Sequence, residues 1–243
     1  MNKGLYSGDY YNDYRSKGHF LKRERGERWH QYGYWLRYIN RHYPGNCCVL
    51  ELGCGLGYFA KVASRAHHYI GIDIALFPLQ VARSKDPAIN LIQGNALKLP
   101  FQSQSVDTVV AFDLLEHISD PGSSISEIYR VLRNNGRLIA TTPNVKSLGN
   151  RLKSPTGKSV PSMYKDPTHV SLLDREEWER LFRGRGFEIS RVATDTLWDI
   201  PYSSRLPVIL QKSILVPFNI SVSYIFGGLP WLLGENLIFV CKK

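Results

Sequence analysis

The sequence predicts an α/β fold built on a doubly wound parallel sheet, and three observations carry that prediction. Short apolar segments that suit buried strands alternate with longer segments of helical pattern. The first apolar segment, 49–52, runs directly into glycines at positions 53, 55 and 57. The second, 69–73, ends in Asp73, which lies 22 residues after Glu51 and so has the spacing of one β-α-β unit.

The expected elements follow one another without internal repeats or low-complexity tracts. An apolar-patterned stretch at 29–43 predicts an N-terminal helix, which Pro44-Gly45 stops before the first strand. Asp174 and Glu177 have capping-box spacing and predict a helix that continues through Phe182. The other expected elements are strand 47–52, helix 56–67, strand 69–73, helix 76–85, strand 89–93, strand 106–111, helix 120–133, strand 136–142, strand 187–192 and strand 236–241.

The glycine-rich loop is typical of a nucleotide-type cofactor site. Its glycines permit a tight turn and a close approach of backbone to ligand, and the helix that follows points its amide end at the site. A dinucleotide fingerprint needs a third glycine at position 58, where Tyr58 stands, so the pattern disfavours NAD. Asp73 is positioned to accept both hydroxyls of a ribose. Two alternatives stay open: a tight turn that binds nothing, and an Asp73 that only caps the next helix.

Further motifs continue this series in order. Gly94-Asn95-Ala96 and Leu99-Pro100-Phe101 are followed by the strand-like segment 106–113, then by Leu114-Leu115-Glu116-His117 and by 130–140. Over roughly residues 46–195 the chain resembles the class I S-adenosylmethionine-dependent methyltransferases, in the type 11/12-like group that includes the ubiquinone-biosynthesis O-methyltransferases. The resemblance implies a Rossmann-like seven-stranded sheet with helices on both faces and an antiparallel last strand.

The resemblance also implies S-adenosylmethionine as the cofactor. Asn95 stands where the family often has Asp, and its side-chain oxygen accepts the same hydrogen bond without the charge, so we expect binding with altered affinity. Asp113 is expected to back the cofactor pocket through its backbone. The residues expected to bind the cofactor are Glu51, Gly53, Cys54, Gly55, Gly57, Asp73, Ile74, Asn95, Ala96, Phe112 and Asp113.

The chain is expected to divide into an N-terminal helical lid segment (1–45), the cofactor-binding core (46–195), an apolar insertion (196–235) and a final core strand (236–243). No charged residue occurs from Ser213 to Gly234, a length that could cross a bilayer. We predict no crossing, because Pro217, Pro230 and Gly227-Gly228 should break any single helix and because a strand expected to join the cytoplasmic sheet follows directly. The insertion is then either an internal lid or an apolar face for membrane or a lipidic acceptor.

The formal net charge is +10, and the excess lies outside the expected core, since residues 46–143 carry eight basic and eight acidic side chains. A basic rim favours an anionic acceptor or an anionic membrane surface, although solvation of exposed helices explains it equally well. The four cysteines have no metal-site spacing and suit a reducing compartment. Without a leader-like opening segment, we expect a cytoplasmic protein, with membrane association as an option.

Methyl transfer to a hydroxyl requires that the proton leave, and a histidine is the suitable base. His117 closely follows the expected fourth strand, on the rim where donor and acceptor would meet. His169 lies in Asp166-Pro-Thr-His-Val170, which resembles the Thr-His segment of the quinone O-methyltransferases. We expect His169 first and His117 second as the base, with packing or capping as the alternative for each. His67-His68 is interpreted as a solvated pair at a helix end.

The predicted function is transfer of a methyl group to a small-molecule acceptor, at a hydroxyl oxygen on an apolar, lipid-linked or anionic substrate of quinone, glycan or glycolipid type. No metal is predicted, although Asp113, Glu116 and Asn144 are of types that could ligate one. An RNA methyltransferase is one alternative, suggested by tyrosines and arginines in residues 1–28 but disfavoured because no RNA-binding module is recognisable. A cofactor-binding protein without turnover is another.

Overall fold

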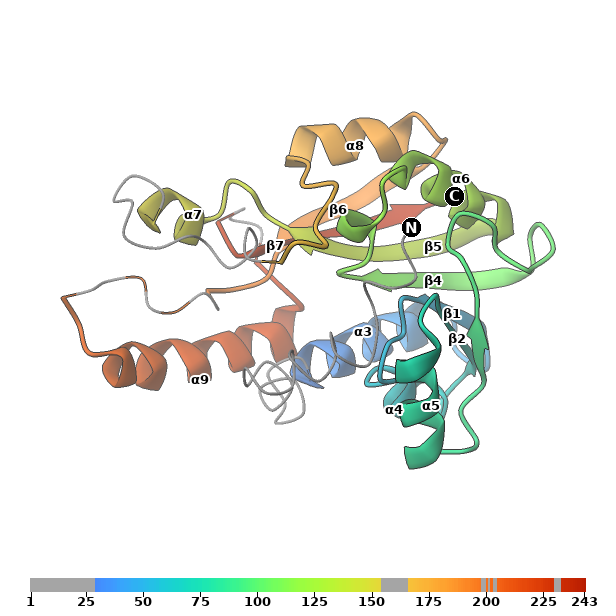
Figure 1. Cartoon of the computed structure of the whole chain (residues 1–243), viewed down its shortest axis with the longest axis horizontal. Helices are drawn as coiled ribbons and strands as arrows, with labels where there is room; N and C mark the ends of the chain where they lie inside the picture. The colour runs from blue at the N-terminus through green and yellow to red at the C-terminus, as the bar shows by residue number, and fades with distance from the viewer. Residues whose placement is uncertain (1–28, 154–165, 198–199, 201, 203–204, 230–232) are drawn as a thin grey trace.

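The computed structural model describes residues 29–153, 166–197, 200, 202, 205–229 and 233–243. Its centre is a seven-stranded sheet with the strand order β3-β2-β1-β4-β5-β7-β6. Neighbouring strands from β3 to β5 pair in parallel, and β7 pairs antiparallel with both β5 and β6. The predicted doubly wound sheet with an antiparallel last strand is therefore confirmed (Figure 1).

The strands begin and end close to their expected positions. The largest difference is in β5, which begins at Leu132 although the expected strand began at position 136. They are β1 (Cys48–Leu52), β2 (His68–Asp73), β3 (Leu91–Gln93), β4 (Val106–Phe112), β5 (Leu132–Pro143), β6 (Glu188–Thr194) and β7 (Asn236–Lys242). The helices are α3 (Trp29–His42), α4 (Ala60–Ala63), α5 (Leu76–Lys85), the short 3-10 helix η2 (Leu115–His117), α6 (Pro121–Val131), α7 (Leu148–Lys153), α8 (Arg175–Arg183) and α9 (Val208–Phe226).

The helix expected at 56–67 is much shorter in the structure, where only Ala60–Ala63 is α-helical. Gly55 and Gly57 have φ values of 48° and 71°, in the left-handed region, so a right-handed helix cannot start before they are passed. The capping box is confirmed: the Asp174 side chain accepts from the Glu177 amide, and the Glu177 side chain accepts from the Asp174 amide.

Helices cover both faces of the sheet and bury two apolar layers (Figure 1). On one face α6 and α8 pack against the strands, with the Phe182 ring 5.1 Å from that of Phe239 in β7. On the other face α3 contributes Trp35, α5 contributes Leu79, and Phe59 comes directly before α4; all three are buried. Burial of this apolar surface fixes the sheet and so fixes the edge at which the parallel strands end.

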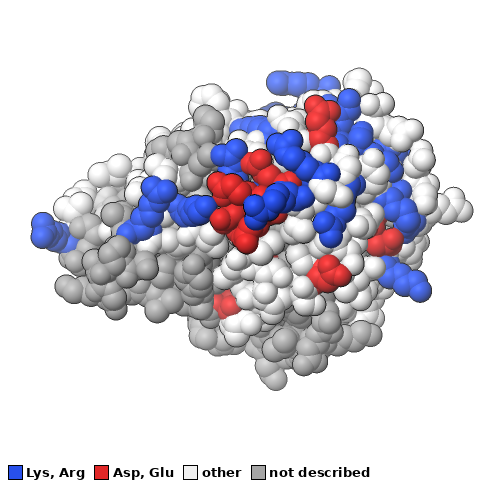
Figure 2. Space-filling view, turned by 90° about the horizontal axis from the view of Figure 1, so that it is seen from above, with Lys and Arg blue, Asp and Glu red and all other residues white. Residues whose placement is uncertain are grey.

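The face above α8 carries many basic side chains interleaved with acidic ones (Figure 2). Lys146 Nζ lies 2.9 Å from Asp174 Oδ2, and Arg183 Nη2 lies 3.4 Å from Glu179 Oε2. Arg175 also pairs with Glu179. Part of the positive excess is thus met by neighbouring carboxylates on this face, which weakens the interpretation of the whole rim as an anion-binding surface.

Within the apolar insertion, Val208–Phe226 form one continuous helix, α9, so the expectation that Pro217 would break a helix was wrong. Proline removes one intrahelical hydrogen bond, but Pro217 lies on the exposed side of α9, where water can reach the backbone carbonyl that it releases. The helix ends at Gly227, whose φ of 62° is that of a left-handed C-cap, as the glycine pair suggested. Pro230 lies outside the described residues.

Within the described residues, α9 has the length and composition of a membrane span, with a mean hydropathy of 1.4 in its most apolar window. Its neighbours exclude a single crossing, because β6 before it and β7 after it pair in one sheet through Thr194 and Leu237. The two ends of the insertion therefore return to the same side. The expectation that this segment does not span the membrane rests on this pairing rather than on Pro217.

Candidate functional site

The expected cofactor residues gather at the edge where the parallel strands end. Asp73 is the last residue of β2, Phe112 is the last of β4, and the glycine loop 53–57 follows β1 directly. Carboxyl ends of parallel strands are the usual binding edge of a doubly wound sheet. Residues from three strands are thus brought to one place.

The glycine loop has a backbone that other residues adopt poorly. Gly53, Gly55 and Gly57 have φ values of 70°, 48° and 71°. A Cβ at Gly53 would lie 2.9 Å from Leu114 Cδ1, whereas a Cβ at Gly55 would have no heavy atom within 4 Å. Gly53 is therefore needed for packing, and Gly55 faces open space into which a ligand can approach the backbone.

Asp73 fastens this loop to β2. Its Oδ2 accepts from the Gly55 amide at 2.9 Å, and its Oδ1 accepts from the Ala75 amide at 2.9 Å. Burial raises the pKa of this carboxyl group, and those two hydrogen bonds oppose the rise. Ile74, which lies between Asp73 and Ala75 in the sequence, is partly buried, and its carbonyl accepts a hydrogen bond from the Gln93 side chain at 3.1 Å.

Glu51 lies inside the protein and is 5% exposed. Burial raises the pKa of Glu51 to about 8, and the hydrogen bond donated by the Tyr69 hydroxyl opposes the rise. Its carboxyl group is therefore mostly protonated at neutral pH. Cys54 beside it is also buried, and burial raises the pKa of its thiol. Tyr69 was not predicted as the partner of Glu51, although its place in β2, directly beside β1, could have suggested it.

Asn95 and Ala96 follow β3 in a tight turn. The Asn95 Oδ1 accepts from the Leu97 amide at 2.9 Å, and Asn95 forms an isolated bridge with Lys98. Asn95 is exposed while Ala96 is buried, so the turn presents the amide side chain to solvent at the edge of the site.

An aromatic cluster closes one side of the same edge. The Phe112 ring lies 5.4 Å from that of Phe59 and 5.5 Å from that of Tyr32 in α3. Asp113, the next residue, has a φ of 48°, and its Oδ1 accepts from Thr141 Oγ1 at 2.7 Å. The Asp113 carboxylate thus contacts the neighbouring strand. Tyr32 was not among the expected site residues, because only the fold brings α3 over the end of β4.

His117 and His169 are brought together, with ring centroids 4.8 Å apart. His117 ends η2 just after β4, and His169 comes from the segment before α8. The His117 Nδ1 lies 2.9 Å from Thr168 Oγ1 and 3.2 Å from the Thr168 carbonyl oxygen. Burial lowers the pKa of His117, and the neighbouring His169 lowers it further, so His117 is neutral at pH 7.

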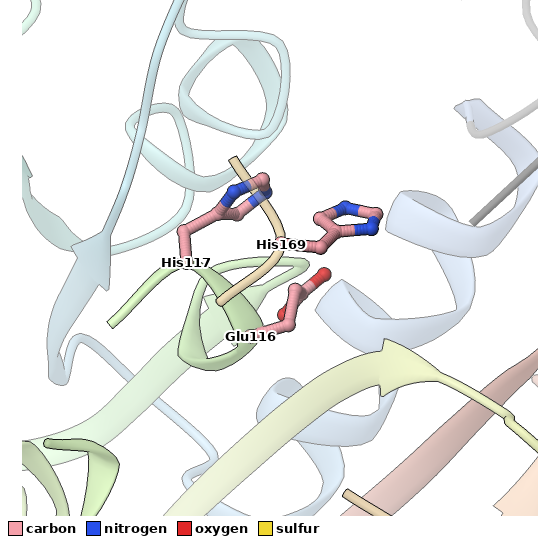
Figure 3. A group of neighbouring side chains, drawn as sticks. All are labelled: Glu116, His117 and His169. Atoms are coloured by element: carbon pink, nitrogen blue, oxygen red, sulfur yellow. The ribbon is translucent and has the colours of Figure 1, made fainter. Parts of the chain in front are cut away.

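Glu116 joins these histidines in a compact group (Figure 3). The carboxyl group of Glu116 is fully buried, and one ligand atom from each of Glu116, His117 and His169 lies within 4.8 Å of the others. The other acids and amides considered for a metal do not join them: Asn144 donates to the Gly234 carbonyl at 2.8 Å, and Asp113 contacts Thr141. Among the described residues, no other group of this kind is found.

His67 and His68 differ from the expected solvated pair. His68 begins β2 and is exposed, but His67 is 6% exposed, and its Nδ1 lies 3.4 Å from Cys47 Sγ. Burial lowers the pKa of His67 and raises that of Cys47 to about 12. These neutral groups lie near the opposite end of β1 from the glycine loop, and the structure gives them a packing role.

The sheet order and the antiparallel β7 match the Rossmann-like fold of solved S-adenosylmethionine-dependent methyltransferases, and the open glycine loop lies beside Asp73. Residues 50–140 match the methyltransferase domain family. Over this part of the sequence the chain is similar to S-adenosylmethionine-dependent methyltransferases, whose cofactor is S-adenosylmethionine. The residues fit this cofactor, because the loop at Gly55 leaves room for it and an acid ends β2.

Two similar proteins illustrate the relationship. A probable S-adenosylmethionine-dependent methyltransferase of Mycolicibacterium smegmatis is 35% identical over 142 residues, which are 58% of this chain and 52% of that protein. An O-methyltransferase of Aspergillus nomiae is 34% identical over 98 residues, covering 37% of this chain and 44% of that protein. The chain thus spans about half the length of the curated relatives it matches.

A solved structure supports the fold in particular. The Thermotoga maritima S-adenosylmethionine-dependent methyltransferase, described as a possible histamine N-methyltransferase, superposes with a TM-score of 0.59. The alignment covers 92% of this chain and 96% of that one at 22% identity. At this identity the likeness establishes the architecture and leaves the acceptor to be argued from the site.

Proposed function

We propose that this protein transfers a methyl group from S-adenosylmethionine to a hydroxyl oxygen of a small-molecule acceptor. The observation that carries the proposal is the His117–His169 pair, whose rings lie 4.8 Å apart just beyond the end of β4. The cofactor supplies a methyl group activated by a sulfonium. The chain's own task is to align the acceptor, exclude water and receive the hydroxyl proton.

His169 is the first candidate for the base, and His117 the second. Thr168 contacts the His117 ring at Nδ1. For His169 the anchoring contact is in the backbone, where its amide donates to the Asp166 carbonyl at 3.3 Å. His117, kept neutral by burial, places no positive charge beside a second imidazole that must accept a proton. His117 is thus held in place and uncharged beside His169. We therefore favour His169 as the side chain that turns toward the substrate hydroxyl and takes its proton.

Asp73, the glycine loop and Asn95 are the proposed cofactor contacts. A carboxylate offers about four acceptor positions. Asp73 accepts two hydrogen bonds from backbone amides, which leaves acceptor capacity for the two ribose hydroxyls. Asn95 is exposed at the next strand end, where its amide can meet the adenine amino group.

The proposed acceptor is apolar or lipid-linked, and α9 supports this class. The buried side chains of α9 are mostly polar. Two of them form hydrogen bonds: Gln211 accepts from the Tyr202 amide at 2.8 Å, and Asn219 donates to the Leu197 carbonyl at 2.7 Å. Its exposed side chains are mostly apolar, with Ile209 77% and Ile214 63% exposed. This is the reverse of a soluble amphipathic helix and suits an apolar surface.

Basic residues at α9 favour an anionic lipid surface. Lys212 is exposed on the helix and Arg205 precedes it, and no acidic residue lies between Arg205 and Gly234. A helix with this composition is expected to lie in the interface, presenting the active edge to a membrane-bound acceptor. We therefore propose a cytoplasmic enzyme with peripheral membrane contact. The tyrosines and arginines of 1–28 that suggested a nucleic-acid acceptor lie outside the described residues.

Release of S-adenosylhomocysteine tests the proposal. We would incubate the protein with S-adenosylmethionine and separate panels of quinol, glycan, glycolipid and RNA acceptors, and detect a mass gain of one methyl group. We expect turnover with a hydroxyl-bearing apolar acceptor. Turnover confined to RNA would replace this function with the nucleic-acid alternative, and cofactor binding without turnover on any panel would leave a binding protein.

A further inference from the structure

The Glu116, His117 and His169 side chains have a donor set that the methyl-transfer reaction does not itself require. Two imidazoles and one carboxylate come from two segments about 50 residues apart in the chain, and one ligand atom from each lies within 4.8 Å of the others. Figure 3 shows the two rings on the same side of the Glu116 carboxyl group. Two histidines with one glutamate is a donor set that catalytic zinc sites use.

Backbone hydrogen bonds hold the two segments against each other. The amides of Val170 and Ser171 both donate to the Glu116 carbonyl at 2.9 Å. The Ser171 hydroxyl donates to the Ile118 carbonyl at 2.7 Å. The residues that flank the three ligand candidates are thus fixed, so the side chains need only rotate to adjust their separation.

His117 has the outer contact typical of a metal-bound histidine. Such a ligand usually donates its other ring N–H to a carbonyl or carboxylate, which sets the tautomer and the ring orientation. The His117 Nδ1 lies 3.2 Å from the Thr168 carbonyl oxygen, and Thr168 in turn donates to Asp166. The tautomer with the proton on Nδ1 offers Nε2 as the ligand atom.

We propose that Glu116, His117 and His169 bind a divalent transition-metal ion of the zinc type. Tetrahedral zinc with bonds of about 2.0–2.1 Å separates its ligand atoms by about 3.3 Å. The candidate atoms lie within 4.8 Å, so small side-chain rotations bring them into range. Imidazole nitrogens favour Zn²⁺, Ni²⁺ or Fe²⁺ over Mg²⁺ and Ca²⁺, which prefer all-oxygen sites.

The site would have a direct use in the reaction. Three protein ligands leave a fourth position, and a hydroxyl bound there loses its proton more readily because the metal lowers its pKa. This role of the ion rests on the proposed function, whereas the binding of the ion does not. Metal ligation and proton acceptance are alternative uses of the His169 imidazole, and a metal titration decides between them.

Calorimetric titration of chelator-treated, full-length protein with ZnCl₂ and, separately, MgCl₂ tests the site. We expect about one equivalent of Zn²⁺ to bind and Mg²⁺ not to compete at equal concentration. Glu116→Gln and His169→Ala should each weaken Zn²⁺ binding at least about tenfold. The matched control is His68→Ala, which removes an exposed histidine at the start of β2 and should leave binding unchanged.

A Co²⁺ spectrum of the unaltered protein keeps the test independent of how the variants fold. Ligation by imidazole and carboxylate gives visible ligand-field bands without the thiolate charge-transfer band that Cys47 beside His67 would add. No Zn²⁺ binding, or binding lost in Cys47→Ser but kept in His169→Ala, overturns the proposal. Zn²⁺ binding at the site without any methyl transfer would overturn only the proposed function.

Discussion

The Asp73 carboxylate accepts a hydrogen bond of 2.9 Å from the Gly55 amide and so links the end of β2 to the loop that follows β1. The acid expected to bind ribose therefore also shapes the loop expected to receive the rest of the cofactor. A single carboxylate at a strand end can do both because it has more acceptor positions than the two that the backbone amides use.

Asp73→Ala should weaken S-adenosylmethionine binding by about 1–3 kcal/mol, the range for hydrogen bonds to a charged group. Titration calorimetry measures the affinity, and thermal unfolding of the same samples checks that the variant is folded. Asp73→Asn retains one side-chain oxygen and should lose less. Unchanged affinity in a folded Asp73→Ala variant would reduce Asp73 to a cap of the loop.

Gly55→Ala should separate folding from cofactor binding. The new Cβ meets no protein atom within 4 Å, so the folded state bears only the left-handed backbone strain, about 1–2 kcal/mol. The methyl group nevertheless occupies the approach of the ligand, and cofactor affinity should fall at least about tenfold. Gly45→Ala is the matched control, since Gly45 also has a positive φ and no atom within 4 Å. Equal affinities for the two variants would contradict a ligand at Gly55.

Glu51 should make the protein less stable as the pH rises. Its pKa is raised from 4.5 to about 8 in the folded chain, so the folded state holds a proton that the unfolded state releases between those values. The free energy of unfolding should drop by about 2–3 kcal/mol between about pH 5.5 and about pH 7.5 through this group. Glu51→Gln, which keeps an acceptor for Tyr69, should remove that part of the slope in denaturant titrations. An identical slope in both proteins would show that Glu51 ionises normally.

His169→Ala and His169→Gln should lower turnover on a hydroxyl acceptor by about a hundredfold or more, while donor affinity stays nearly unchanged. The loss should shrink at high pH, where the acceptor ionises unaided. His117→Gln should have a smaller effect, because Thr168 already engages that ring. Near-native turnover of both His169 variants at neutral pH would leave alignment alone to account for the rate.

Ile209→Asp and Ile214→Asp should abolish co-flotation with anionic vesicles without unfolding the protein, because both side chains are more than half exposed. Leu76→Asp on α5 places the same charge at an exposed apolar position, 47% exposed, away from α9, and should float like the parent protein. If the parent protein stays in solution with anionic and neutral vesicles alike, α9 is a surface lid and the lipid-linked acceptor loses its support.

The sequence alone determined the features that depend on neighbours along the chain. The glycine loop, the acid that ends the second strand, the capping box and the alternation of strands with helices are local patterns, since each arises from backbone conformation or from one periodic face. The antiparallel last strand came from the resemblance of these patterns to a family, and the sheet bears it out.

Tertiary structure alone decided which distant side chains meet. Tyr32 reaches Phe112, and His169 reaches His117 and Glu116, because packing of helices on the sheet closes chain separations that no local spacing encodes. Tertiary structure also decided that α9 continues through Pro217, where the local expectation was a break. The proline faces outward, and the buried side chains of Gln211 and Asn219 anchor the helix through hydrogen bonds.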